Sequence, residues 1–352
     1  MEPVTHILMG AVLSRAGLNR KAAYMTAAMT IAAEFPDIDM VWGWSGPVAG
    51  FEHHRGITHT FVGLPVEAAV VTGLFYAYHR FRKTETAAPL SWAWLYGGAM
   101  LALLSHLLLD WTNNYGLRPF FPFNPRWYAG SFVFIVEPVL LLILALALLG
   151  PALFGLINSE VGAGRAKFKG RGSAIVALLA VAALYCLRYV EHAKALEAAT
   201  QAAPPDMLRV FASPHPTNPF TWHIVTETPA SYQLSTMDSR SGAVEPSSPS
   251  DTIYKPAPTL PILAAKRSPL GEVYLDWSMY PVLTETPDNR DPNHPLVEIR
   301  FSDARFYYDV GPLHGKPDGG GKPPLSGTVL LDMAAPDAQR VVETKMDDLV
   351  QK

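Results

Sequence analysis

The chain has 352 residues, of which 49% are hydrophobic and 17% are charged, and its mean hydropathy is +0.13. This length allows two domains, and the intermediate hydropathy indicates a membrane half joined to a soluble half. The net charge of −3 and the lack of a basic recognition element argue against nucleic acid as a partner. The single cysteine, Cys186, excludes a disulfide framework within the chain.

Two short apolar segments open the chain, at 7–13 and 22–33, with basic residues between them. Each is shorter than the roughly 20 residues that a membrane helix needs. Four later apolar runs are near that length and are predicted membrane spans. These runs cover residues 59–78, 91–111, 132–153 and 173–189. The lipid bilayer is therefore an expected partner, and the first half is predicted to be an α-helical polytopic membrane domain over residues 1–192.

The composition changes beyond about residue 195, where prolines, serines and threonines multiply and long apolar runs end. Alternating and aromatic-rich segments there predict strands, separated by turn-rich sequence. The predicted strands are 220–226, 232–236, 273–280, 296–301, 306–310 and 328–331. Residues 193–352 are therefore predicted to form a β-rich soluble domain.

A histidine-rich stretch, Glu52-His53-His54-Arg55-Gly56-Ile57-Thr58-His59, directly precedes the first long apolar run. Imidazole is a common metal ligand near neutral pH because its neutral ring carries a free nitrogen lone pair. Gly56 permits a tight turn that would bring His54 and His59 to one point. Arg55 suits a phosphate or carboxylate, and Thr58 is an expected N-cap for the following helix. The alternative is an interfacial loop with histidines at the level of the lipid headgroups.

Three carboxylates, Glu34, Asp37 and Asp39, follow the second short apolar segment. Pro36 disfavours helical backbone at the preceding residue, so the helix should end near Glu34. The helix dipole disfavours anions at this end, and a bound cation would explain the cluster. A solvated turn after the helix is the simpler alternative.

Two ionisable residues interrupt the second predicted span. His106 and Asp110 are four residues apart and so share one helix face. Because ionisable groups are costly inside a membrane, the pair is a candidate functional site, with a structural hydrogen bond between packed helices as the alternative. Asn113 and Asn114 extend this polar cluster. Glu137 is predicted inside the third span, before a proline that could kink it.

The distribution of lysine and arginine predicts the orientation in the membrane. Basic residues follow the first long span and lie between the third and fourth, which places both loops in the cytoplasm. His59, the Asp110 end of its helix and the C-terminal domain then lie outside. His6 and the 34–39 carboxylates join them if the basic residues near the N-terminus face inward. The basic residues near the N-terminus are Arg15, Arg20 and Lys21. Those after the first long span are Arg80, Arg82 and Lys83, and those between the third and fourth spans are Arg165, Lys167, Lys169 and Arg171.

This order of motifs resembles the YdjM-like inner-membrane proteins over roughly the first 190 residues. The resemblance implies an inner-membrane location. It also implies hydrolytic chemistry, because the members of the family are predicted to be metal-dependent hydrolases. A weaker similarity is to zinc-dependent phospholipase C and the P1-type nucleases, which share the spacing from Asp39 to His53 and from His106 to Asp110. Their N-terminal tryptophan ligand is replaced here by Met1, which puts a three-zinc arrangement in doubt.

The predicted function is a membrane-bound, metal-dependent hydrolase of a phosphoester, a phospholipid or another lipid-linked substrate at the external membrane face. Zinc is the expected metal, with manganese as the alternative, at one to three ions. Asp37 or Glu34 would act as general base, and Arg55 would hold the anionic group. The non-enzymatic alternative is a structural metal site, a metal transporter or a scaffold. The candidate metal ligands are His6, Asp37, Asp39, His53, His54, His59, His106 and Asp110.

Overall fold

The computed structural model describes residues 1–82, 86, 88–160, 170–245, 249–288, 296–308 and 322–351. The chain divides into two compact units. The first comprises residues 1–39, 55–190 and 216–219, and the second comprises 40–54, 191–215 and 220–352. The second unit thus takes a short N-terminal segment in addition to the C-terminal part of the chain.

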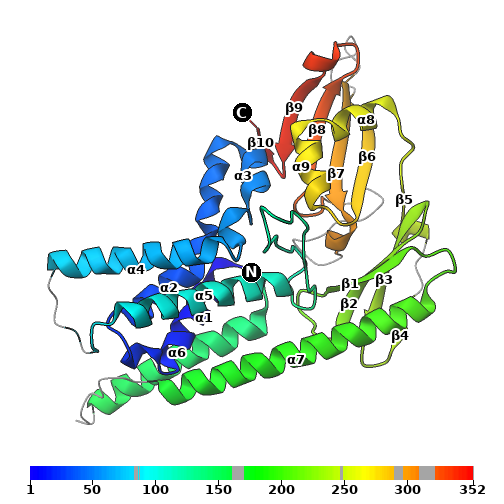
Figure 1. Cartoon of the computed structure of the whole chain (residues 1–352). Coiled ribbons are helices and arrows are strands. Elements are labelled where there is room, and N and C mark those ends of the chain that lie inside the picture. Colours follow the sequence, from blue (N-terminus) through cyan, green and yellow to red (C-terminus); the bar gives the residue numbers. More distant parts are fainter. Residues whose placement is uncertain are drawn as a thin grey trace. The chain divides into compact units, whose positions relative to one another are not determined.

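The first unit is helical, and its long helices run alongside one another in Figure 1. The 3-10 helices η1, η2 and η3 lie between some of them, and η2 continues from the first unit into the second. The elements are α1 (Pro3–Arg15), η1 (Leu18–Arg20), α2 (Met25–Glu34), η2 (Phe35–Ser45), η3 (Ile57–His59), α4 (Gly63–Arg82), α5 (Trp92–Thr112), α6 (Pro138–Glu160) and the first part of α7 (Arg171–Ala202).

Small side chains allow these helices to pack closely. Ala28 and Ala32 of α2 and Ala99 and Ala102 of α5 are fully buried in one apolar core. Gly10 of α1 lies so near α2 that an added Cβ would stand 2.4 Å from a backbone oxygen of α2. Close approach of helix backbones through small residues is typical of helix packing in membranes. This packing brings the α2 backbone within hydrogen-bonding reach of α5 side chains.

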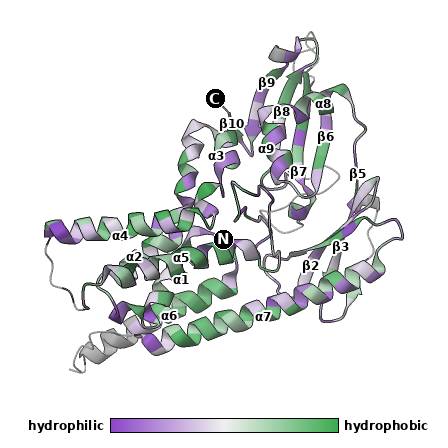
Figure 2. Cartoon of the chain, in the orientation of Figure 1, coloured by the Kyte–Doolittle hydropathy of each residue, from purple (hydrophilic) through white to green (hydrophobic). Residues whose placement is uncertain are grey.

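Two helices among the described residues, α5 and α7, are long and apolar enough to cross a membrane. A third candidate is the broken pair formed by Pro47–His59 and Gly63–Arg82, if the two segments make one span. The Pro138–Pro151 part of α6 is apolar but shorter. The apolar character of these helices is visible in Figure 2. The helical N-terminal half with candidate membrane spans is therefore as the sequence predicts, with two or three candidates in place of four.

The start of the third predicted span is wrong. Residues 132–137 are not helical, and α6 begins at Pro138. Glu137 therefore precedes the helix, and Pro138 starts it without kinking it, because proline lacks the N–H that a first helical turn leaves unpaired. Glu137 is buried and forms an ion pair with Arg188 of α7.

The second unit contains two antiparallel sheets among its described residues. In the first sheet the strands are ordered β1-β2-β3-β4 and β5 also pairs with β3; in the second the order is β10-β9-β8-β7-β6. The predicted strands at 220–226, 232–236, 296–301 and 328–331 are confirmed. The strands are β1 (Arg209–Pro214), β2 (Thr221–Glu227), β3 (Ser231–Asp238), β4 (Ala243–Val244), β5 (Thr252–Tyr254), β6 (Pro281–Asp288), β7 (Leu296–Asp303), β8 (Gly327–Asp332), β9 (Val341–Met346) and β10 (Leu349–Val350).

Helices complete the second unit and correct one strand prediction and the first residue of another. Residues 273–277 belong to helix α9, in which Ser268 caps the N-terminus and Pro269 is the first residue. Leu270, Tyr274 and Trp277 are buried at helical spacing, which alternation alone does not reveal. Residues 304–306 form a 3-10 helix, and residues 309–310 lie outside the described part. The helices are α3 (Pro47–His53), η4 (Pro249–Asp251), α8 (Leu260–Lys266), α9 (Pro269–Trp277), η5 (Ala304–Phe306) and η7 (Asp337–Gln339).

Candidate metal centre

Four ionisable side chains from three segments of the first unit meet at one point. Asp37 comes from η2, His59 from η3, and His106 and Asp110 from α5. One ligand atom from each lies within 4.8 Å of all the others. His59, His106 and Asp110 are buried, and Asp37 is 10% exposed. These four residues are named the His/Asp cluster below.

The ring of His106 is oriented by a backbone carbonyl of α2. Its Nδ1 lies 2.7 Å from the oxygen of Ala33, which can only accept a hydrogen bond. The proton of the neutral ring is therefore on Nδ1, and Nε2 presents a lone pair. Nε2 faces the cluster, 3.5 Å from Asp110 Oδ2 and 3.8 Å from Asp37 Oδ1. A hydrogen bond from the ring nitrogen that does not bind the metal is typical of metal-binding histidines.

A carboxylate orients His59 in the same manner. Its Nδ1 lies 3.2 Å from Oδ2 of Asp39. The same oxygen accepts hydrogen bonds from the Arg55 backbone N–H at 2.8 Å and from the Thr58 hydroxyl at 3.0 Å. Oδ2 of Asp39 thus orients the imidazole, and Nε2 of His59 lies 3.2 Å from Asp37 Oδ1.

Asp110 directs its two oxygens to different groups. Oδ2 faces His59 at 3.6 Å and His106 at 3.5 Å. Oδ1 contacts the Met1 amino group and lies 2.9 Å from the Arg55 guanidinium. These cations stabilise the ionised carboxylate, which is otherwise costly to bury.

His6 lies beside the cluster on α1. Its ring stacks on His106 with centroids 3.8 Å apart, and its Nε2 is 3.4 Å from Asp110 Oδ1. The side chain is fully buried, and neither ring nitrogen has a hydrogen-bond partner among the described residues. An unpaired buried polar atom is uncommon and often marks the place of a ligand or ion.

Arg55 is buried and connects Asp110 to the segment after α5. Its guanidinium donates to the backbone oxygen of Gly116 at 2.6 Å and stacks on Tyr115 at 4.6 Å. It also lies 3.4 Å from Oδ1 of Asn113. The predicted role of Arg55 in holding an anionic substrate stays a prediction, since the contacts described here are internal.

The two predicted general bases differ in their protonation. Burial raises the pKa of Asp37, but its hydrogen bond with His59 and the nearby histidine charges outweigh this and hold the pKa well below its usual range. Asp37 is thus an ionised acceptor suited to ligation. Burial, followed by the charge of Asp37, raises the pKa of Glu34 to about 8. Glu34 therefore carries a proton at neutral pH and can donate it.

The remaining predicted site residues belong to the second unit. His53 is the last residue of α3, and His54 is its C-cap. Their role as metal ligands stays a prediction. Thr58 is not the N-cap of the following helix, because α4 begins only at Gly63, where the Thr60 hydroxyl accepts the Gly63 N–H at 3.0 Å. The Thr58 hydroxyl instead binds Asp39.

Sequence reasoning missed the groups that orient the histidines. The Ala33 carbonyl carries no side-chain signal, and only the run of small residues around it indicates a close helix contact. The sequence predicts helix capping for Thr58 and metal ligation for Asp39, and the ligation by Asp39 stays a prediction. Asn113 was included in the polar cluster, and its amide nitrogen lies 3.4 Å from Asp110 Oδ1.

The cluster and the basic residues lie at opposite ends of the helical unit. Met1 and His6 at the start of α1 join the C-terminal half of α5 at one end (Figure 1). Arg15 reaches the oxygen of Leu148 in α6, and Arg171 reaches the oxygen of Ala16, so these basic residues share the other end. Lys83, Arg165, Lys167 and Lys169 lie outside the described residues.

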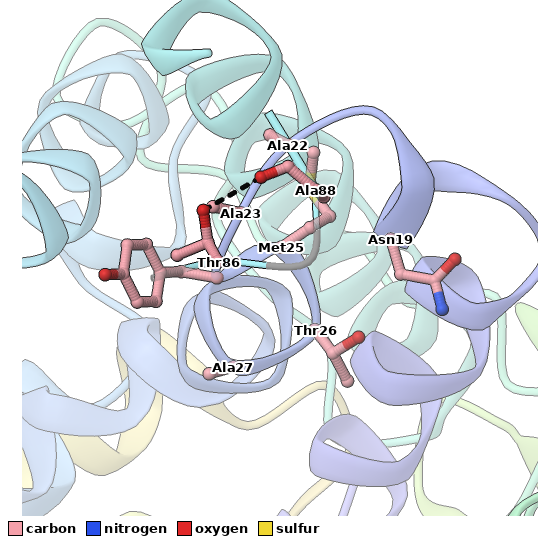
Figure 3. Close-up of a pocket in the computed structure, with 9 residues that line it drawn as sticks. Asn19, Ala22, Ala23, Met25, Thr26, Ala27, Thr86 and Ala88 are labelled. Carbon is pink, nitrogen blue, oxygen red and sulfur yellow. Dashed lines mark hydrogen bonds between the residues drawn. The ribbon is translucent and has the colours of Figure 1, made fainter. Parts of the chain in front are cut away.

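A pocket of about 280 Å³ near the start of α2 is a poorer candidate site. Figure 3 shows its lining, which is mostly small, with the Thr86 hydroxyl bonded to the oxygen of Ala88 at 2.9 Å. Its described lining includes no histidine, cysteine or carboxylate. The described lining of this pocket therefore offers no side chain of the kinds that usually bind a metal or act as an acid or base in hydrolysis.

The donor set of the His/Asp cluster fits a divalent transition metal. Imidazole nitrogen and carboxylate oxygen are ligands that zinc accepts, and manganese favours the carboxylates. Two imidazole Nε2 atoms and two carboxylates face one point, while the other nitrogen of each ring contacts the Ala33 oxygen or Asp39. The fold and this site define a membrane protein with a candidate metal centre in its helical half.

Comparison with known proteins gives the family. The YdjM inner membrane protein family matches residues 1–195, and the chain belongs to this family. It is also 25% identical over 146 residues to the uncharacterized protein YfhP of Bacillus subtilis (strain 168), covering 39% of this chain and 42% of that protein. The chain thus spans less than half the length of this curated relative. No solved structure matches.

Proposed function

We propose that this protein is a metal-dependent hydrolase that cleaves a phosphoester at the external face of the inner membrane. One observation carries the proposal. Nε2 of His59, Nε2 of His106 and carboxylate oxygens of Asp37 and Asp110 converge, and both rings are anchored through Nδ1. A bound divalent ion would be held by these four residues and would lower the pKa of a bound water and polarise a phosphoryl oxygen.

The surrounding residues supply the other functions that hydrolysis needs. Glu34, protonated near neutral pH, is placed at the end of α2 to give a proton to a leaving group. Asp39 and the Ala33 carbonyl hold the histidines in one orientation. His6 is a further candidate ligand, because its buried Nδ1 has no hydrogen-bond partner among the described residues and its Nε2 lies 3.4 Å from Asp110 Oδ1.

A turnover assay on detergent-solubilised full-length protein tests the proposal. Protein loaded with zinc or manganese is supplied with bis-p-nitrophenyl phosphate, phosphatidic acid and phosphatidylglycerol. We expect wild-type turnover, its loss in His59→Ala, and a reduction of about 10²- to 10⁴-fold in Glu34→Gln with metal retained. His79→Ala is the matched control, because His79 lies on α4 and bonds Tyr24 instead of the cluster. Absence of turnover in metal-loaded wild type would overturn the proposal.

The burial of the cluster favours a second candidate, a structural metal centre. His6, His59 and His106 are fully buried and Asp110 is 1% exposed. A closed site with every position filled by protein stabilises the fold without catalysing a reaction. Metal binding without turnover, together with a large loss of thermal stability on metal removal, would support this candidate.

A further inference from the structure

An apolar groove lies on the first unit, and segments that hold the His/Asp cluster contribute to its walls. It has a volume of about 390 Å³, within the range of small-molecule sites. Nine of the described residues line it, and none of these nine carries a charge. The lining includes Phe61, Leu107, Leu108, Trp111, Leu117 and Phe120.

The segments that hold the cluster also build the groove. Leu107 and Trp111 directly follow the cluster residues His106 and Asp110 on α5, and Phe61 is two residues after His59. The Phe61 N–H donates to the oxygen of Pro119 at 3.0 Å, which fixes the two walls of the groove to each other.

Arg55 provides a second connection between the groove and the cluster. Its guanidinium binds Asp110 of the cluster at 2.9 Å and the Gly116 oxygen at 2.6 Å. Gly116 directly precedes Leu117, a buried lining residue whose N–H donates to the oxygen of Tyr128 at 2.9 Å. These contacts connect the segment that lines the groove to the His/Asp cluster.

The exposed walls of the groove indicate what occupies it. Leu108, Phe61 and Phe120 are 58%, 49% and 47% exposed, although all three are large and apolar. Leu108 and Trp111 belong to α5, a candidate membrane span, so this surface would meet acyl chains in a bilayer. A groove whose described lining carries no charge disfavours a charged headgroup and suits a hydrocarbon chain.

We propose that the groove binds an acyl chain of a membrane lipid whose polar head lies at the His/Asp cluster. The assignment of this lipid as the substrate rests on the proposed hydrolase function. The binding of the chain in the groove does not depend on that function. The inference thus gives the substrate class as an amphiphile with a phosphorylated head and at least one long acyl chain.

Photocrosslinking tests the binding of the chain. Full-length protein in nanodiscs of phosphatidylethanolamine and phosphatidylglycerol is irradiated with a phosphatidic acid that carries a diazirine in its acyl chain. Labelled residues are mapped by peptide mass spectrometry. Leu108→Trp fills the groove, and Leu101→Trp is the matched control. Leu101 lies seven residues earlier on the same helix face, is 41% exposed and does not line the groove.

We expect adducts concentrated on the groove residues in wild type and in Leu101→Trp, and at least a fivefold loss in Leu108→Trp, with metal content equal in all three proteins. Uniform labelling along the exposed face of α5, unchanged by Leu108→Trp, would show annular lipid contact only and would overturn the inference. Groove labelling in a protein without hydrolytic turnover would uphold the binding site and refute the proposed function, so the two failures are distinguishable.

Discussion

Nε2 of His59 lies 3.0 Å from Nε2 of His106. Each ring is anchored through its other nitrogen, His59 to Asp39 and His106 to the Ala33 oxygen. With one proton on each ring, the two Nε2 lone pairs face each other and the oxygens of Asp37 and Asp110. Only a cation or additional ring protons can make this arrangement favourable, and a metal ion satisfies all four groups together.

The role of Asp39 as the group that orients His59 gives the first prediction. Asp39→Asn removes the negative charge behind the imidazole while nearly preserving shape. We expect metal affinity to fall by about 10- to 100-fold, the usual effect of losing such a partner. Competition with a chromophoric chelator measures the affinity. Asp206→Asn, at an exposed position of the second unit, is the control. An unchanged affinity in Asp39→Asn would argue against the orienting role.

Close packing of α1 on α2 gives the second prediction. A Cβ at Gly10 would lie 2.4 Å from the Met29 oxygen and 2.7 Å from the Ala33 Cβ. Gly10→Ala should therefore destabilise the protein by about 1–3 kcal/mol, and it should weaken metal binding because the Ala33 carbonyl moves. Thermal unfolding in detergent measures the first effect. Gly97→Ala in α5 meets nothing within 4 Å and should leave stability equal or higher. Equal stability of both variants would contradict this packing argument.

The orientation of the helical unit gives the third prediction. The basic ends of the helices should be cytoplasmic and the cluster external. In a Cys186→Ser background, a maleimide that cannot cross the inner membrane should label Thr286→Cys in cells whose inner membrane is intact and whose outer layers admit the reagent. It should label Arg82→Cys only after the membrane is opened. Thr286 is an exposed residue of β6, and Arg82 ends α4. Labelling in the opposite order would refute the orientation.

A histidine of the second unit gives the fourth prediction. Burial lowers the pKa of His223 to about 4, with His215 acting in the same direction and the hydrogen bond to the Ala304 oxygen opposing it. The unfolded value is about 6.5, so the unfolded state binds more protons between these values. The stabilisation is complete above about pH 6.5 and is lost as pH falls toward 4. Denaturant titrations that follow the unfolding of the second unit should show its free energy of unfolding falling as pH decreases from about 6.5 toward 4. His223→Gln should reduce this dependence on pH. An unaltered slope would assign the pH dependence to other groups.

The sequence allowed much of the fold class to be predicted. Long apolar runs mark α5 and α7, and β-branched segments mark β2, β7 and β8, because these patterns follow from burial. The residues of helix α9 are predicted as a strand because the aromatic-rich pattern favours one, and the N-terminal cap formed by Ser268 and Pro269 lies outside that pattern. The start of α6 was displaced because residues 132–134 are buried without being helical.

Only the ionisable residues of the candidate site could be predicted from the sequence. Asp37, His59, His106 and Asp110 are conspicuous because such groups are costly beside apolar sequence. The Ala33 carbonyl could not be predicted, because every residue carries one and its use depends on the packing of α2 against α5. The internal contacts of Arg55 were equally hidden, since its partner Gly116 contributes only backbone.

Metal analysis of purified protein tests the central claim most directly. Wild type, the His59→Ala/His106→Ala double variant and the His79→Ala control are loaded with zinc or manganese, desalted and measured by mass spectrometry of the metal. Each lost ligand removes a strong bond, so the double variant should lose nearly all bound metal while His79→Ala retains the wild-type amount. Circular dichroism confirms that the variants remain folded. Retention of the wild-type metal content by the folded double variant would contradict the assignment of the His/Asp cluster as the metal centre.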